Sequence, residues 1–73
     1  MVQTLNAIGK KCPMPVLLTK KELKKMNPGD FLEVIADDRG VLEDIPALLR
    51  RTGDKIVETR EDNGNIIMKI EKV

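Results

Sequence analysis

Residues 55–73 read KIVETREDNGNIIMKIEKV and carry the strongest local structural signal in the chain. Apolar and polar residues alternate over residues 55–60 and again over residues 65–73, as they do in strands with one buried face. Between the two runs stand Asn63 and Gly64, a pair that favours a type I′ turn because both central positions of that turn need a positive φ. The stretch therefore predicts a β-hairpin.

Two strand–helix patterns precede this hairpin. Residues 2–8 predict a short strand, and residues 31–36 (FLEVIA) predict an apolar strand that is either covered on much of both faces or central in a sheet. Apolar residues at helical spacing, together with straight-chain helix formers, predict a helix over about residues 13–26. A second apolar arc predicts a helix over about residues 44–51, with Pro46 in its first turn and a looser turn before it.

The order of these elements predicts an α/β fold, β-α-β-α-β-β. Each parallel βαβ crossover is expected to be right-handed, which places both helices on one face of the sheet if the strand order does not reverse. The expected architecture is a two-layer α/β sandwich. With 73 residues the chain forms a single domain over residues 1–73, and a chain of this size buries only about 60% of the surface that its unfolded form exposes.

Composition excludes several classes of function. The chain has one cysteine and no histidine, which rules out an internal disulfide, the usual zinc ligands and histidine-dependent acid–base chemistry. No apolar run approaches the ~20 residues of a membrane-spanning helix, so no membrane partner is expected. The first residues lack the basic and apolar regions of a signal peptide, so we expect a cytoplasmic protein.

The charges are unevenly distributed along the chain, although the net charge is only +1. Residues 1–30 hold six lysines and two acidic residues, whereas residues 31–73 hold seven basic and ten acidic residues. The only cysteine, Cys12, lies in the basic part. A single aromatic residue, Phe31, provides no stacking platform for bases, so a direct nucleic-acid partner is not expected.

Cys12 is expected in the first of two loops at one edge of the sheet, beside the helix N-termini, where α/β proteins place ligand and reaction sites. The helix dipole and the neighbouring Lys10 and Lys11 favour the thiolate, and such surroundings lower a cysteine pKa from ~8.5 into roughly the 3.5–7.5 range. Pro13 and Pro15 stiffen the turn that presents the sulfur. The alternative is a buried cysteine that acts as a small hydrophobic residue. The polar neighbours favour the reactive, exposed thiol.

The second loop contains two carboxylates, Asp37 and Asp38, for which two roles are open. In the favoured interpretation both carboxylates cap the second helix. In the alternative interpretation they orient the loop of Cys12. A carboxylate very near the sulfur would raise the pKa of the thiol. Lys10 and Lys11 either attract an acidic partner surface or are solvated charges. Three apolar residues near the cysteine form either a docking patch or ordinary exposed positions: Met14, Leu17 and Leu18.

The sequence around the cysteine also resembles a known family. Cys12 to Pro15 form a Cys-Pro-x-Pro motif after a short strand that ends in a glycine; a Pro-Gly turn, an apolar strand, Ala36-Asp37-Asp38 and Asp44-Ile45-Pro46 follow. In this arrangement essentially the whole chain resembles the TusA/SirA-like family of small sulfur carriers. The resemblance implies a β-α-β-α-β-β sandwich with a mixed four-stranded sheet. It also implies that Cys12 is the carrier residue and that Pro13 and Pro15 complete its motif.

The function implied by this resemblance is sulfur relay. Cys12 would accept sulfane sulfur as a persulfide from a cysteine desulfurase or a related donor and pass it to a downstream acceptor protein. In the best-known branch of the family the sulfur is used for tRNA thiolation, while other branches resemble proteins of sulfur oxidation, molybdenum cofactor or selenium metabolism. A persulfide carrier must have no second cysteine nearby, because that thiol would convert the persulfide into an internal disulfide. This chain has no second cysteine.

These features suggest a carrier protein more than a stand-alone enzyme. No cofactor and no metal are expected, and nothing in the sequence requires more than a monomer. Two other hypotheses remain. The protein could be a thiol redox or selenium-related regulator, because a thiolate that accepts sulfur also reacts with peroxide. It could instead be a non-covalent protein or RNA interaction module, since the fold also resembles a domain of a translation initiation factor.

Overall fold

A computed structural model of the chain describes residues 2–11 and 13–73. Its elements follow the predicted order and agree with the predicted bounds within two residues, except at the start of the second helix. They are β1 (Val2–Ala7), α1 (Met14–Lys25), β2 (Phe31–Ala36), α2 (Val41–Thr52), β3 (Lys55–Asp62) and β4 (Asn65–Glu71).

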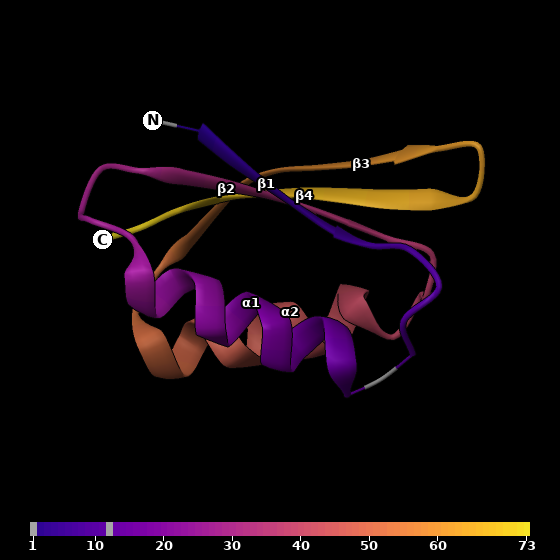
Figure 1. Cartoon of the computed structure of the whole chain (residues 1–73), viewed down its shortest axis with the longest axis horizontal. Helices are drawn as coiled ribbons and strands as arrows, with labels where there is room; N and C mark the ends of the chain where they lie inside the picture. Colours follow the sequence, from indigo (N-terminus) through magenta and orange to yellow (C-terminus); the bar gives the residue numbers. More distant parts are fainter. Residues whose placement is uncertain (1, 12) are drawn as a thin grey trace.

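The four strands form one mixed sheet in the order β1-β2-β4-β3. β1 and β2 are parallel, whereas β4 pairs antiparallel with both β2 and β3. Both helices cover the same face of the sheet, so the molecule has one helix layer and one strand layer (Figure 1). The predicted two-layer sandwich with a mixed four-stranded sheet is confirmed.

The core lies between these two layers. Alternate residues of β2 and β4 point toward the helices and are buried, as their period of two requires. Leu23 of α1 and Ile45 of α2 enter the same core from the opposite side. The largest fully buried aliphatic side chains are Leu23, Leu32, Ile45, Ile66, Met68, Ile70 and Val34.

No helix of the described residues covers the other face of the sheet (Figure 1). Phe31 and Ile35 of β2 are half-buried there, and the Lys69 ammonium lies 5.0 Å from the centre of the Phe31 ring. Arg60 donates to Glu58 at 2.7 Å and lies 3.8 Å from Glu33. Of the two alternatives for this apolar strand, a central place in the sheet is confirmed, because β2 lies between β1 and β4.

The second helix is where the predicted bounds are wrong. α2 begins at Val41, not near Asp44, and Pro46 lies inside it instead of in its first turn. The Gly40 carbonyl accepts the Asp44 N–H at 2.9 Å, so a helical turn has closed before the proline is reached. Pro46 lacks an N–H and therefore removes one i→i−4 hydrogen bond from the helix. The helix nevertheless forms because three of its side chains are buried against the sheet: Val41, Ile45 and Leu49.

The hairpin turn has the predicted conformation. Asn63 has a φ of 50° and Gly64 a φ of 81°, as a type I′ turn requires. β3 departs from a regular strand at a bulge between Ile56 and Glu58. The turn residues thus set the register between β3 and β4. β4 is a central strand of the sheet, between β2 and β3.

Candidate functional site

The loops that follow β1 and β2 meet at the carboxyl ends of these parallel strands. The Asp37 carboxylate accepts a hydrogen bond from the Gly9 N–H at 3.0 Å, across 28 positions of sequence. Gly9 has a φ of +83°, a backbone conformation that residues with a Cβ rarely adopt. This bond fixes one end of the loop in which Cys12 stands to the end of the neighbouring strand.

Asp38 makes a different, local contact. Its Oδ1 accepts the N–H of Gly40 at 2.9 Å, and Gly40 is the residue directly before α2. The helix itself has no side-chain hydrogen bond at its N-cap. The favoured interpretation of the sequence, in which these carboxylates cap the second helix, is therefore wrong: Asp37 binds the first loop, and Asp38 binds an N–H in the turn before the helix. Asp38 supports the turn that enters α2.

The prolines of the motif take two distinct positions at the start of α1. Pro13 is the N-cap residue and is exposed, whereas Pro15 is buried within the first turn. The Pro15 carbonyl accepts the hydroxyl of buried Thr19 at 2.7 Å, which satisfies that hydroxyl inside the core. The Lys11 carbonyl accepts the Met14 N–H at 2.9 Å. These contacts anchor the chain on both sides of position 12.

Cys12 itself lies outside the described residues. The residues on either side of it are exposed: Lys10 and Lys11 before it, Pro13 and Met14 after it. Ile8 is also exposed, with 45% of its surface accessible. The loop that contains the cysteine therefore combines two cations with accessible apolar side chains.

A shallow groove of about 260 Å³ runs between the first turn of α1 and α2. Its walls are mostly apolar, with one acidic and one basic side chain from α2. The lining residues are Pro13, Val16, Asp44, Ala47, Leu48 and Arg51. Arg51 is exposed and borders this groove. Only the packing of α1 against α2 brings these residues together.

The sequence indicated Gly9 only as the end of a strand and did not reveal its contact with Asp37. The sequence did contain a signal for this contact. A glycine follows the first parallel strand and Asp37 follows the second, so the glycine N–H can donate a hydrogen bond to the carboxylate. The contribution of Thr19 was also missed, because a threonine within a helical apolar pattern indicates burial but not the carbonyl that its hydroxyl contacts.

The hydrogen bond between the loops leads to a testable expectation. Asp37→Ala is expected to lower the free energy of unfolding by about 1 kcal/mol and to speed hydrogen exchange at the Gly9 amide, because the amide loses its acceptor. Asp37→Asn keeps an oxygen at the same place and should lie between wild type and Asp37→Ala. Amide exchange measured by NMR checks this. An unchanged Gly9 exchange rate in Asp37→Ala would show that the bond does not hold the loop.

Within residues 2–11 and 13–73, no helix is long and apolar enough to cross a membrane. In the same part of the chain, no three carboxylate side chains lie close enough together to hold a metal ion.

Comparison with known proteins gives consistent matches over almost the whole chain. A family model described as Sulfurtransferase TusA matches residues 3–72. The sulfur carrier protein TusA of Allochromatium vinosum is 40% identical over 70 residues, which cover 96% of this chain and 92% of that protein. A putative sulfur carrier protein of Neisseria meningitidis is 42% identical over 62 residues, 85% of this chain and 84% of the relative.

A solved structure shows the same fold. The crystal structure of a SirA-like protein from Desulfitobacterium hafniense superposes with a TM-score of 0.84 at 29% identity. The superposition covers 97% of this chain and 96% of that protein.

Proposed function

The chain belongs to the TusA family, and from that premise we propose that it is a sulfur carrier in which Cys12 holds the transferred sulfur as a persulfide. As a sulfur carrier it interacts with a protein that donates sulfur and with a protein that accepts it. We propose a cysteine desulfurase or a related persulfide enzyme as the donor. The acceptor belongs to a pathway of tRNA thiolation or of other sulfur metabolism, and the protein acts in the cytoplasm.

The proposed transfer needs no outside oxidant or reductant. The Cys12 thiolate attacks the outer sulfur of a donor persulfide, R–S–SH, and a new sulfur–sulfur bond forms at Cys12 Sγ. The sulfur–sulfur bond of the donor breaks, and its inner sulfur leaves with the electron pair as the thiolate R–S⁻. The products are Cys12–S–SH and R–S⁻, so one sulfane sulfur has moved and both sides balance. Delivery to the acceptor repeats the exchange in the opposite sense.

The observation that carries this proposal is the anchoring of the loop around position 12. Gly9 is bound to Asp37, and Met14 is bound to the Lys11 carbonyl, while the flanking side chains of Lys11 and Pro13 are exposed. A loop that is fixed at both ends and accessible between them suits a residue that must enter the active site of another protein. The two lysines and the start of α1 also favour a thiolate at this point of the chain.

The sequence supports the same chemistry by what it lacks. A second cysteine beside a persulfide would attack it and release the sulfur while forming an internal disulfide. Cys12 is the only cysteine of the chain, so the loaded sulfur can leave only to another molecule. The chain also has no histidine to serve as a catalytic base, which fits a carrier whose partner enzymes supply the acid–base groups.

The test is the intact mass of the purified protein after incubation with a cysteine desulfurase and cysteine. We expect a gain of about 32 Da, one sulfur atom, that dithiothreitol reverses and that Cys12→Ser does not show. No adduct with any persulfide donor, on a thiol that alkylates readily, would contradict the carrier proposal and favour a redox role. A Cys12 that also resists alkylation in the folded protein would support the buried alternative.

A further inference from the structure

The two edge strands of the sheet differ in their chemistry. β1 pairs only with β2 and β3 only with β4, so each edge strand has a row of backbone N–H and C=O groups with no strand beside it in the described chain. Such a row is a template for pairing with another chain, and proteins usually block it with charged side chains, prolines or bulges. In this sheet the two edges are not equally blocked.

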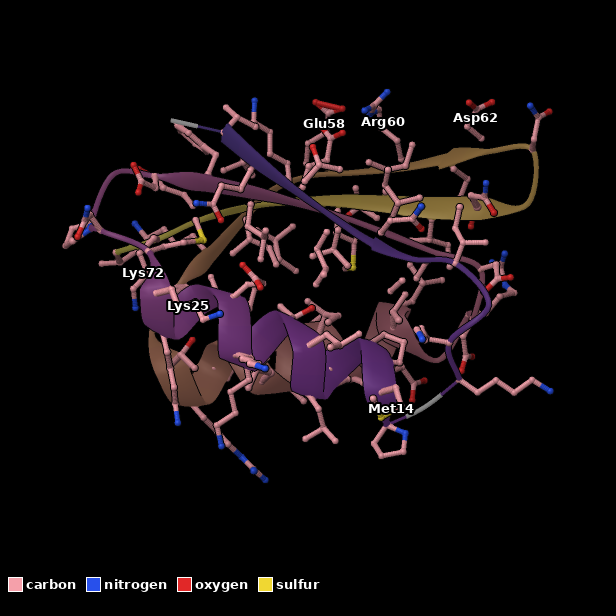
Figure 2. All side chains as sticks on the ribbon, viewed as in Figure 1. Met14, Lys25, Glu58, Arg60, Asp62 and Lys72 are labelled. Carbon is pink, nitrogen blue, oxygen red and sulfur yellow. The ribbon has the colours of Figure 1, made fainter. Side chains whose placement is uncertain are left out.

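β3 is the blocked edge. Five of its eight residues, KIVETRED, are charged. Figure 2 shows three of these side chains, Glu58, Arg60 and Asp62, along β3 on the side of the sheet away from the helices. The strand also has a bulge between Ile56 and Glu58. A strand that paired with β3 would meet an irregular ladder and would remove water from charged groups, so this edge disfavours pairing.

β1 has none of these protective features. Its residues, VQTLNA, include no charged residue and no proline, although 34% of the whole chain is charged. β1 keeps an unbroken register with β2 from Val2 to Ala7, without a bulge. It crosses in front of β2 in Figure 1, and no other described segment is drawn over it. β1 therefore presents a regular, uncharged and accessible edge.

Exposed apolar residues stand at both ends of this edge. Val2, the first residue of β1, is 57% exposed, and Ile8, directly after the strand, is 45% exposed. Between them the exposed residues are polar but uncharged: Gln3, Thr4 and Asn6. An antiparallel neighbour of the same sequence would bring the first end of one strand beside the last end of the other.

The faces of β1 restrict the register of such a pair. Ala7 is fully buried and Leu5 packs against the core, so these two side chains point toward the helices. Thr4 and Asn6 alternate with them and lie on the outer face. Residues directly opposite each other in an antiparallel pair share a face, and a slip by one residue would exchange the two faces. Two copies can therefore form a continuous sheet only in registers that differ by two residues.

The apolar residues select one of these registers. With Leu5 of one copy opposite Leu5 of the other, Val2 lies opposite Ile8 and Thr4 lies opposite Asn6. With Thr4 opposite Thr4, Val2 would instead lie opposite polar Asn6. With Asn6 opposite Asn6, Val2 would have no strand residue opposite it. Apolar cross-strand pairs stabilise a sheet, so the register centred on Leu5 is favoured.

We infer that the free edge of β1 is a docking site for β1 of a second copy of this chain, in antiparallel pairing centred on Leu5. The two sheets then continue into one sheet around a two-fold axis. A single strand pair is a small interface, so the dimer forms reversibly and its fraction rises with concentration. This inference does not depend on the proposed function.

The dimer leaves the cysteine loops apart. Each loop follows the last residue of β1, and antiparallel pairing places these two ends at opposite ends of the joined strands. Six residues of strand span about 20 Å, so the loops are separated by about this distance. A partner protein can therefore reach either loop without displacing the second copy.

The first experiment follows self-association by sedimentation velocity over about a hundredfold range of concentration. It uses the Cys12→Ser protein, in which no disulfide can link two copies. Thr4→Lys is expected to raise the dissociation constant of the dimer about tenfold or more, because the two new ammonium groups lie about 7–8 Å apart on one face of the joined sheet. Thr59→Lys is the matched control, since Thr59 is an exposed threonine of the other edge strand. It should associate like the parent protein.

The second experiment tests the register by cross-linking in the same Cys12→Ser background. Leu5→Cys is expected to form an intermolecular disulfide under mild oxidation, because directly opposite Cα atoms lie about 4.5–5.5 Å apart, within the range of a disulfide. Thr4→Cys is diagonal to itself at about 7–8 Å and should remain uncross-linked. Circular dichroism checks that every variant is folded.

The outcomes are decisive for the second copy as occupant. Association that Thr4→Lys weakens and Thr59→Lys does not, together with cross-linking of Leu5→Cys, supports the inference. A protein that stays monomeric at every concentration overturns it, as does association that both lysine variants retain. If the protein is monomeric and hydrogen exchange in β1 slows only when a sulfur donor or acceptor is added, the edge binds that protein and the inference is also overturned.

Discussion

Cys12→Ser is expected to deliver no sulfur at all when the protein is placed between a persulfide donor and an acceptor in a reconstituted relay. A serine hydroxyl is not ionised near neutral pH and forms no persulfide, so the variant has no group to carry the sulfur. Because the chain has one cysteine, no other residue can replace it. Transfer of radiolabelled sulfur from cysteine to the acceptor, measured with and without the protein, gives the result directly.

This variant also distinguishes the carrier from a non-covalent interaction module. Serine differs from cysteine by one atom, and the anchoring contacts of the loop, from Gly9 to Asp37 and from Met14 to Lys11, do not involve position 12. We therefore expect Cys12→Ser to keep the wild-type stability and to compete with the wild type for the donor. Retained sulfur delivery by Cys12→Ser would rule out Cys12 as the carrier residue.

Ile45→Ala is the substitution with the largest expected effect on folding. Ile45 is fully buried on α2 between the helix layer and the sheet. Truncation of such a residue costs about 2–5 kcal/mol through lost burial and the cavity that remains. Whole domains are stabilised by only about 5–15 kcal/mol, and a short chain lies toward the low end, so a large part of the stability would be lost. Urea denaturation followed by circular dichroism measures the change.

The control is Val57→Ala, which removes apolar atoms at an exposed position of β3. Such surface substitutions usually change stability by less than about 0.5 kcal/mol. A midpoint of Ile45→Ala that equals that of Val57→Ala would show that α2 does not contribute its buried side to the core as described. Because Ile45 lies in the core and not in the cysteine loop, the folded fraction of Ile45→Ala should still load sulfur on Cys12.

Local features of the sequence determined most of the fold. The pair Asn63 and Gly64 specifies its turn because two successive positive φ values exclude most other residues. Alternation in residues 65–71 matches the buried side of β4, because side chains of a strand point to opposite faces in turn. The apolar run of residues 31–36 predicted a strand but did not show which of its side chains face the helices.

The tertiary structure decided what depends on contacts between distant segments. Sequence analysis began the second helix near Asp44 because Pro46 disfavours a helix interior, but burial of Val41 against the sheet extends α2 to that residue. The local sequence shows that Pro46 destabilises a helix interior, but it does not show the burial of Val41 that compensates for this loss.

The candidate site shows the same division. The sequence placed a thiol, two lysines and two prolines in one loop, and it left open whether Asp37 binds that loop or the second helix. The hydrogen bond from Gly9 to Asp37 joins residues 28 positions apart, and only the parallel pairing of β1 with β2 brings their ends together. Likewise, the sequence identified exposed apolar residues near Cys12, but only packing decided which side of α1 faces outward. Composition and spacing fix which groups a chain carries; the sheet and the core fix which of them meet.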